Sequence, residues 1–259
     1  MDLESFNTSR ESLVPLLALN NKSNKNIIIF PTDKEAIEFS TDFSNLNKNI
    51  FHLPSWDTLS YDSFVPSFDI QGKRLEIAHL LLTNNNYNIS TSIKAISQRI
   101  YFEELEICKI ELNEEIDFDS LIENLIHLKY QRKDRVESKG SFAVRGGQLD
   151  VYPINYDLPL RVIFDGDLVN EIKTFDTISQ RSVSEKKDIL IVPATELFQI
   201  KHSDILNLSS NKKENLDDYE LFQYSQNLDL EKCLLDLTSN VALHIVDKNI
   251  VDNQLKEII

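Results

Sequence analysis

Residues 130–155 read YQRKDRVESKGSFAVRGGQLDVYPIN, and residues 158–181 read LPLRVIFDGDLVNEIKTFDTISQR. Both stretches alternate apolar and polar positions over short runs. This pattern is typical of β-strands, because successive side chains of a strand point to opposite faces of the sheet. Phe142 and Val144 are predicted on one face, and Arg145 on the other. The two stretches together predict a small sheet that is rich in hairpins.

Arginines recur on the polar positions of these predicted strands. Leu160 and Val162 are expected to share a face, whereas Arg161 points the opposite way. A planar guanidinium can bind a carboxylate through two parallel hydrogen bonds, so such a face is a candidate docking surface for a carboxylate-bearing partner. A lone arginine more often only solvates a sheet face, but recurrence across neighbouring strands favours docking. We therefore expect Arg132, Arg145 and Arg161 to form one patch.

The two adjacent glycines in the middle of this region have a structural interpretation. The apolar positions change phase between Val144 and Leu149, as a β-bulge requires. Glycine permits the positive φ that many bulges need. Gly146 and Gly147 are therefore predicted to form a β-bulge, not a functional loop.

Composition sets the class of protein. The chain has 259 residues, 41% of them hydrophobic and 27% charged, which is typical of a globular protein with a sizeable core. No apolar run approaches the ~20 residues of a membrane helix, and the polar, acidic N-terminus does not resemble a signal peptide. The two cysteines, Cys108 and Cys233, lie far apart, so we expect both to be reduced in a cytoplasmic protein.

The net charge of −15 argues against duplex DNA as a direct partner of this chain. Most of the affinity for DNA comes from lysines and arginines that neutralise phosphates. The one local excess of positive charge is in residues 132–145, where a protein docking site explains it at least as well as nucleic acid does.

The hydrophobic pattern predicts an α/β fold with an α+β insert. The apolar run Asn26–Phe30 is predicted to be a buried strand, and Thr32 or Asp33 is predicted to cap the helix that follows it. The other predicted elements are strands at 49–53, 90–96, 105–112 and 241–246, helices at 69–82 and 118–128, a polar turn at 84–88 and a helix that begins at 249.

Three segments are expected from this pattern. Residues 1–104 are predicted to form the first part of one domain, and residues 105–180 a small α+β domain. Residues 181–259 are predicted to return to the first domain, with 187–192 re-entering its sheet and a polar linker at about 203–227.

Motifs in the order Tyr-x-Arg, Gly-Ser-Phe-x-Val-Arg-Gly, Leu-Asp-Val-Tyr-Pro, Arg-Val-x-Phe-x-Gly-Asp and Phe-Asp-x-x-x-Gln-Arg run through residues 130–181. A second block lies in residues 53–82, LPSWDTLSYDSFVPSFDIQGKRLEIAHLLL. Together they resemble the UvrB-like module of bacterial excision repair, which occurs in UvrB and near the N-terminus of the transcription-repair coupling factor Mfd. The resemblance extends from about Asn26 to Pro193 and fades beyond Leu197. The matching residues of the second block are Pro54, Trp56, Asp57, Thr58, Leu59, Tyr61, Asp62, Asp69, Ile70, Arg74 and Leu75.

The resemblance implies a RecA-like parallel-sheet domain, of the P-loop NTPase type, interrupted by a small α+β domain that binds UvrA. UvrB carries a phosphate-binding loop, G-x-x-x-x-G-K-[ST], near its N-terminus. This chain has only five glycines, and Gly72-Lys73 lacks the glycine five residues earlier. The polar stretch 20–25 stands roughly where the loop would fall. We therefore expect a degenerate RecA-like domain without ATP hydrolysis, catalytic residues or cofactor.

Other sites for chemistry are also not indicated. The five histidines are scattered without metal-ligand spacing, and no pattern suggests a catalytic nucleophile. The acidic run Asp217–Glu220 sits in a polar segment and is interpreted as solvated charge.

The resemblance assigns UvrA binding to arginines on the sheet face of the small domain. Arg132 matches the arginine of Tyr-x-Arg, Arg145 the one before the glycine, and Arg161 the one that opens Arg-Val-x-Phe. Two positions depart from UvrB: Ala143 replaces a further arginine, and Ile163 replaces an acidic residue. These departures imply a weaker or differently shaped interface.

Two functions follow from the resemblance. The first is a non-catalytic adaptor that binds UvrA and brings nucleotide excision repair to stalled RNA polymerase. The alternative is the N-terminal part of an ATP-dependent, helicase-like DNA translocase whose motor motifs lie outside this chain, with this module autoinhibitory. In either case RNA polymerase and DNA would bind through other regions of a longer protein, and no membrane or metal is involved.

Overall fold

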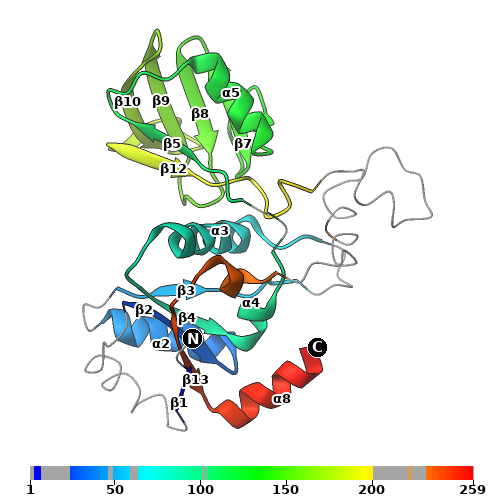
Figure 1. Ribbon diagram of the computed structural model, residues 1–259. Coiled ribbons are helices and arrows are strands. Elements are labelled where there is room, and N and C mark those ends of the chain that lie inside the picture. Colours follow the sequence, from blue (N-terminus) through cyan, green and yellow to red (C-terminus); the bar gives the residue numbers. More distant parts are fainter. Residues whose placement is uncertain are drawn as a thin grey trace, which may run out of the picture. The chain divides into compact units, whose positions relative to one another are not determined.

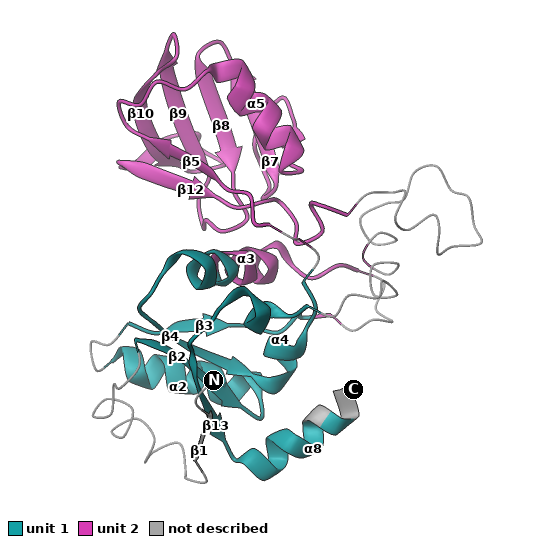
Figure 2. Cartoon of the chain, in the orientation of Figure 1, with its two compact units in different colours: residues 1–57, 77–100, 229–259 teal, residues 58–76, 101–228 magenta. Residues whose placement is uncertain are grey.

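The computed structural model describes residues 3–6, 24–45, 49–58, 64–100, 102, 104–200, 222 and 232–258 (Figure 1). The chain forms two compact units (Figure 2). Unit 1 comprises residues 1–57, 77–100 and 229–259, and unit 2 comprises residues 58–76 and 101–228.

Unit 1 contains the parallel sheet that the buried-strand pattern predicts. Its strands lie in the order β1-β13-β2-β4-β3, and every neighbouring pair is parallel. The apolar run after Asn26 forms the central strand β2, whose five residues from Asn26 to Phe30 are all buried. The parallel α/β architecture is confirmed. The strands are β1 Leu3–Phe6, β2 Lys25–Phe30, β3 Phe51–Leu53, β4 Tyr87–Ser92 and β13 Ala242–Val246.

Helix α2 begins as its capping residues predict. The hydroxyl of Thr32 accepts a hydrogen bond from Glu35 N, and Glu35 Oε2 accepts one from Thr32 N at 3.1 Å. This reciprocal pair satisfies backbone donors that a helix start otherwise leaves unpaired. Asp33 instead holds the ends of β3 and β4, because its carboxylate accepts hydrogen bonds from the hydroxyls of Ser55 and Ser92. Helix α2 spans Asp33–Ser44. The other helical elements of unit 1 are α4 Ile93–Ser97, η1 Leu234–Leu237 and α8 Lys248–Ile258.

The strand predicted over 90–96 is wrong in its second half. β4 ends at Ser92, and the chain turns at once into α4. The Ser92 hydroxyl accepts a hydrogen bond from Ala95 N at 3.0 Å, so a serine that fits a strand pattern acts as a helix cap. The apolar residues of α4 pack in the interior, as Ile93 and Ile96 are buried. The apolar residues of 90–96 are therefore buried by a short helix, and not by the strand that their pattern predicted.

Unit 2 contains the hairpin-rich sheet. Its six strands lie in the order β11-β10-β9-β8-β7-β6, antiparallel except for the pair β6 and β7. One face of this sheet packs on α5 and on the two-stranded sheet of β5 and β12, around a core that includes Phe142, Val162, Leu125 and Ile189. The elements are β5 Cys108–Glu111, α5 Phe118–His127, β6 Gln131–Arg132, β7 Ser141–Arg145, β8 Gln148–Tyr152, β9 Leu160–Asp165, β10 Leu168–Phe175, β11 Ser182–Glu185 and β12 Asp188–Ile191.

Residues 187–192 do not re-enter the parallel sheet, and this prediction is wrong. β12 pairs antiparallel with β5, and Ile189 and Ile191 enter the core of unit 2. A short run that buries alternate residues fits an antiparallel pair as well as a parallel sheet, so the pattern alone did not distinguish them. The polar linker predicted over 203–227 lies, apart from Phe222, outside the described residues.

The predicted bulge at Gly146–Gly147 is a tight hairpin turn instead. The β7–β8 register runs without a shift from Ser141–Tyr152 to Arg145–Gln148, so the two glycines connect the strands. Gly146 adopts a positive φ of 60°. At Gly147 a Cβ atom would lie 2.8 Å from the carbonyl oxygen of Phe164. Both positions therefore require glycine for the structure, although not for the reason expected.

Helix α3, Phe68–Thr83, crosses the boundary between the units and contains a glycine at a close approach. A Cβ atom on Gly72 would lie 2.5 Å from the carbonyl oxygen of Ile154. Glycine in a helix interior normally destabilises the fold by about 0.5–1 kcal/mol relative to alanine. If nothing lay close to Gly72, Gly72→Ala would therefore stabilise the protein. Here we expect the clash with backbone to dominate and to lower the free energy of unfolding by about 1–3 kcal/mol.

Urea unfolding of Gly72→Ala beside Lys73→Ala, an exposed neighbour on the same helix, measures this effect. A Gly72→Ala variant as stable as the wild type would contradict the close approach.

Candidate functional site

A hollow at the β6 edge of the six-stranded sheet brings together two of the three arginines that the sequence singled out. It is lined by Arg132, Lys133, Asp134, Val144 and Arg145. Arg132 and Arg145 are both exposed. The guanidinium of Arg132 makes no hydrogen bond or ion pair with the described residues, and Arg145 Nη2 donates to the carbonyl oxygen of Asp134 at 2.9 Å.

Backbone hydrogen bonds fix the two arginines at this edge. Gln131 N donates to Gly140 O at 2.9 Å, and Lys133 N donates to Phe142 O at 2.8 Å, which aligns β6 along β7. Arg145 is the last residue of β7, directly before the tight turn. The positions of these side chains therefore depend on sheet hydrogen bonds, which are more rigid than a loop.

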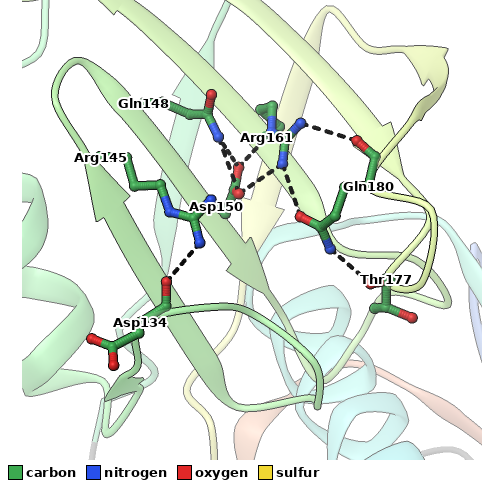
Figure 3. A network of polar contacts seen from close by, with 7 residues as sticks. All are labelled: Asp134, Arg145, Gln148, Asp150, Arg161, Thr177 and Gln180. Carbon is green, nitrogen blue, oxygen red and sulfur yellow. Dashed lines mark hydrogen bonds and ion pairs between the residues drawn. The ribbon is translucent and has the colours of Figure 1, made fainter.

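Arg161 lies two strands away from Arg145, on the face of the sheet opposite the core (Figure 3). The register pairs Ala143 with Asp150 and Asp150 with Arg161, so these side chains share that face. Arg145 shares it too, because it follows Ala143 by two residues in β7. We call this the open face.

Arg161 is engaged within the domain. Its Nε and Nη2 atoms donate to the two carboxylate oxygens of Asp150 at 2.7 and 2.8 Å, the bidentate geometry that guanidinium and carboxylate favour. The guanidinium carbon lies 4.4 Å from the ring centroid of Phe175, and Nη1 donates to Gln180 O at 3.3 Å. The Arg161 side chain is 15% exposed and that of Asp150 only 6%. The hydrogen bonds that Arg161 donates to Asp150 raise the pKa of Arg161, so the guanidinium stays charged.

The charge left for a partner lies mainly at the hollow. Asp150 balances Arg161, and the Gln148 amide also donates to both Asp150 oxygens. Arg132, Lys133 and Arg145 contribute three positive charges around the hollow, against the single carboxylate of Asp134. This arrangement suits the binding of carboxylates from a partner protein.

The described residues offer little for catalysis or metal binding. They contain no group of three or more His, Cys, Asp or Glu side chains placed to hold a metal ion. Both cysteines are free, and burial raises the pKa of the Cys108 thiol to about 12, so that thiol is protonated at neutral pH.

Sequence reasoning missed the partners of Arg161. Asp150, inside the motif Leu-Asp-Val-Tyr-Pro, falls on a polar position of β8 directly beside β9. A signal was present, because an acidic residue at that position of one strand and an arginine on the next can pair across them. Lys133 was noted only as part of a local excess of charge, yet it lines the hollow with Arg132.

Comparison with known proteins agrees with this architecture. Residues 108–197 match the UvrB interaction domain. The match begins at the first residue of β5 and ends six residues after β12, so it covers the sheet, α5 and the hollow.

The similar curated proteins are transcription-repair coupling factors and UvrB proteins. The chain is 29% identical over 174 residues to the transcription-repair-coupling factor of Escherichia coli, covering 66% of this chain and 15% of that protein. It is 32% identical over 159 residues to that of Myxococcus xanthus, covering 60% and 13%. It is also 23% identical over 215 residues to the UvrABC system protein B of Thermosipho africanus, covering 76% and 32%.

These matches confirm the resemblance to the UvrB-like module that transcription-repair coupling factors share with UvrB. The chain spans only 13% to 32% of the lengths of these three relatives. None of the helices in the described ranges is both long enough and apolar enough to cross a membrane.

Proposed function

We propose that this chain is a non-catalytic adaptor module that binds UvrA. In this proposal it brings nucleotide excision repair to stalled RNA polymerase as part of a transcription-repair coupling factor. The observation that carries the proposal is the match of residues 108–197 to the UvrB interaction domain, which coincides with the sheet that presents the basic hollow. RNA polymerase and DNA would bind other regions of a longer protein.

We assign direct contact with UvrA to Arg132 and Arg145, two of the residues that line the hollow. Arginine is among the residue types that contribute most to the binding free energy of protein interfaces. Truncating an arginine at the centre of an interface commonly weakens binding by about 2 kcal/mol or more. Arg161 lies on the same face as Arg145, where its ion pair with Asp150 holds the neighbouring strands in place. Arg132 is paired with the core residue Phe142, so its side chain leaves β6 on the other face, at the edge of the sheet. The partner surface is expected to carry carboxylates, because those are the groups that a guanidinium binds through two hydrogen bonds.

Unit 1 would serve this adaptor as a degenerate RecA-like domain. Its five parallel strands support that interpretation, and the chain contains no G-x-x-x-x-G-K-[ST] sequence to bind phosphates.

A titration of the wild-type chain against purified UvrA tests the proposal, with duplex DNA as a second ligand. We expect saturable binding to UvrA that weakens from 50 to 500 mM salt, since exposed charge pairs are screened over about 10 Å at 0.1 M salt. Duplex DNA should bind far more weakly, given the net charge of −15. The absence of UvrA binding at high micromolar concentration would reject the adaptor function and favour an autoinhibitory module.

A further inference from the structure

The turn between β10 and β11, which Arg161 contacts from the open face, exposes an apolar side chain to solvent. Ile178 is 86% exposed, the highest value among the large hydrophobic residues that the structure describes, and Val183 in β11 is 59% exposed. Single exposed hydrophobic residues are common on protein surfaces and need no explanation by themselves. Ile178 differs because the turn that carries it is held by many hydrogen bonds.

Hydrogen bonds within the turn fix its backbone. Ser179 N and Ser179 Oγ both donate to Asp176 Oδ1 at 2.8 Å, Gln180 N donates to Asp176 O at 2.8 Å, and Asp176 N donates to Arg181 O at 3.0 Å. The bonds from Ser179 lower the pKa of Asp176, so its carboxylate stays ionised and accepting at neutral pH. Gln180 has a positive φ of 59°, which a non-glycine residue rarely adopts unless its surroundings hold it there.

Two arginines hold the turn from outside. Arg135 Nη2 donates to Thr177 O at 2.8 Å and to Ile178 O at 3.3 Å. Arg161 Nη2 donates to Gln180 Oε1 at 3.3 Å, in addition to the bond from Nη1 to the carbonyl oxygen of the same residue. The backbone that carries Ile178 is therefore held in place, so a partner would remove little backbone entropy from this turn on binding.

The segment 133–137 joins this turn to the basic hollow. At one end Asp134 O accepts from Arg145, and one residue later Arg135 reaches the turn. The next residue, Val136, is buried against Ala143 and Phe175 on the open face. Arg145, which lines the hollow, is thus linked through this segment to the turn that carries Ile178. Two exposed basic residues belong to this region: Arg135 donates to the turn, and Arg181 closes it through its carbonyl oxygen.

We propose that Ile178 is an apolar anchor of the UvrA-binding surface, which enters a pocket on the partner that is apolar in its depth and bordered by carboxylates. This inference rests on the proposed function. The geometry supports it because an exposed aliphatic side chain on a backbone held by hydrogen bonds, with basic residues near it, can bury apolar area in a partner pocket while polar groups surround the contact.

The test is a titration of the full chain against UvrA for the wild type, Ile178→Ser, Ile178→Leu and Ile126→Ser. Ile126 is the matched control, because it is 53% exposed in α5, which packs on the other face of the sheet. We expect Ile178→Ser to weaken binding at least tenfold, Ile178→Leu to bind within about threefold of the wild type, and Ile126→Ser to bind like the wild type.

The outcomes separate this inference from the proposed function. Undiminished binding of Ile178→Ser, with wild-type binding intact, would overturn the anchor and leave the adaptor function standing. Equal losses for Ile178→Ser and Ile126→Ser would overturn the anchor as well, because the effect would then not depend on position. A wild-type chain that does not bind UvrA would remove the proposed function and the anchor with it.

Discussion

Replacing Glu196 by alanine is expected to lower the free energy of unfolding of unit 2 by about 3–5 kcal/mol. Arg74 Nε lies 2.9 Å from Glu196 Oε1, and the two side chains are only 1% and 5% exposed. Removal of the carboxylate takes this counter-charge away from a guanidinium in the interior, and breaking a buried ion pair by removing one of its members commonly costs about 3–5 kcal/mol. Urea unfolding followed by circular dichroism measures the loss.

The surroundings of this ion pair leave little room for it to rearrange. The side-chain oxygen of Gln71 accepts hydrogen bonds from Glu196 N and from the Thr195 hydroxyl, both at 3.0 Å. The Gln71 amide in turn donates to Pro66 O at 2.8 Å. These bonds hold the backbone at Glu196, so the chain cannot easily shift to compensate for the loss of the carboxylate.

Two further variants make the result specific. Glu123→Ala on the exposed side of α5 removes the same charge and should change stability by less than about 0.5 kcal/mol. The double variant Arg74→Met/Glu196→Leu replaces both charges by apolar groups and should lose less than Glu196→Ala alone. If Glu196→Ala unfolded at the same urea concentration as the wild type, the buried pair would not stabilise the fold.

The second large effect is expected at Asp150, where alanine should lower the free energy of unfolding by about 3 kcal/mol. The Asp150 carboxylate accepts two hydrogen bonds from Arg161 and two from the Gln148 amide. It joins the central strands β8 and β9, and Arg161 continues the network to the turn at Gln180. We expect a loss at the lower end of the range of about 3–5 kcal/mol for broken buried ion pairs, because the Arg161 side chain is still 15% exposed to water.

Asp165→Ala is the matched control for Asp150, because that carboxylate is exposed at the end of the same strand as Arg161. The control should unfold like the wild type. Hydrogen exchange adds a local measurement: in Asp150→Ala the amides of residues 176–180 should lose protection, because Arg161 no longer holds that turn. Unchanged exchange there would contradict the coupling between Asp150 and the turn.

The elements that could be predicted from the sequence are those whose signal is local. Thr32 and Asp33 marked a helix start, and the apolar run of β2 marked a buried strand, because capping and burial act within a few residues. Pairing was not predictable in the same way. Residues 187–192 formed a strand as expected, but the choice of β5 as their neighbour depends on a contact with residues 108–111, far away in the chain.

The candidate site followed the same rule. Arg132 and Arg145 were found from strand alternation and from the resemblance, and the structure places both at one hollow. The engagement of Arg161 by Asp150 depends on the register of two strands, which the sequence does not specify without the hairpin geometry. Ile178 carries no signal in the hydrophobic pattern, because its meaning comes from exposure and from the hydrogen bonds of its turn.

The most direct test of the adaptor function is the affinity of Arg132→Ala/Arg145→Ala for UvrA. Its control is Lys34→Ala/Lys94→Ala, which removes the same two positive charges from exposed positions of unit 1. We expect the arginine variant to fold normally and to bind UvrA at least a hundredfold more weakly, because two hot-spot arginines are lost. The lysine variant should bind within about twofold of the wild type, since exposed charges outside an interface contribute little. Equal affinity of the arginine variant and the wild type would contradict the assignment of the hollow as the UvrA-binding site.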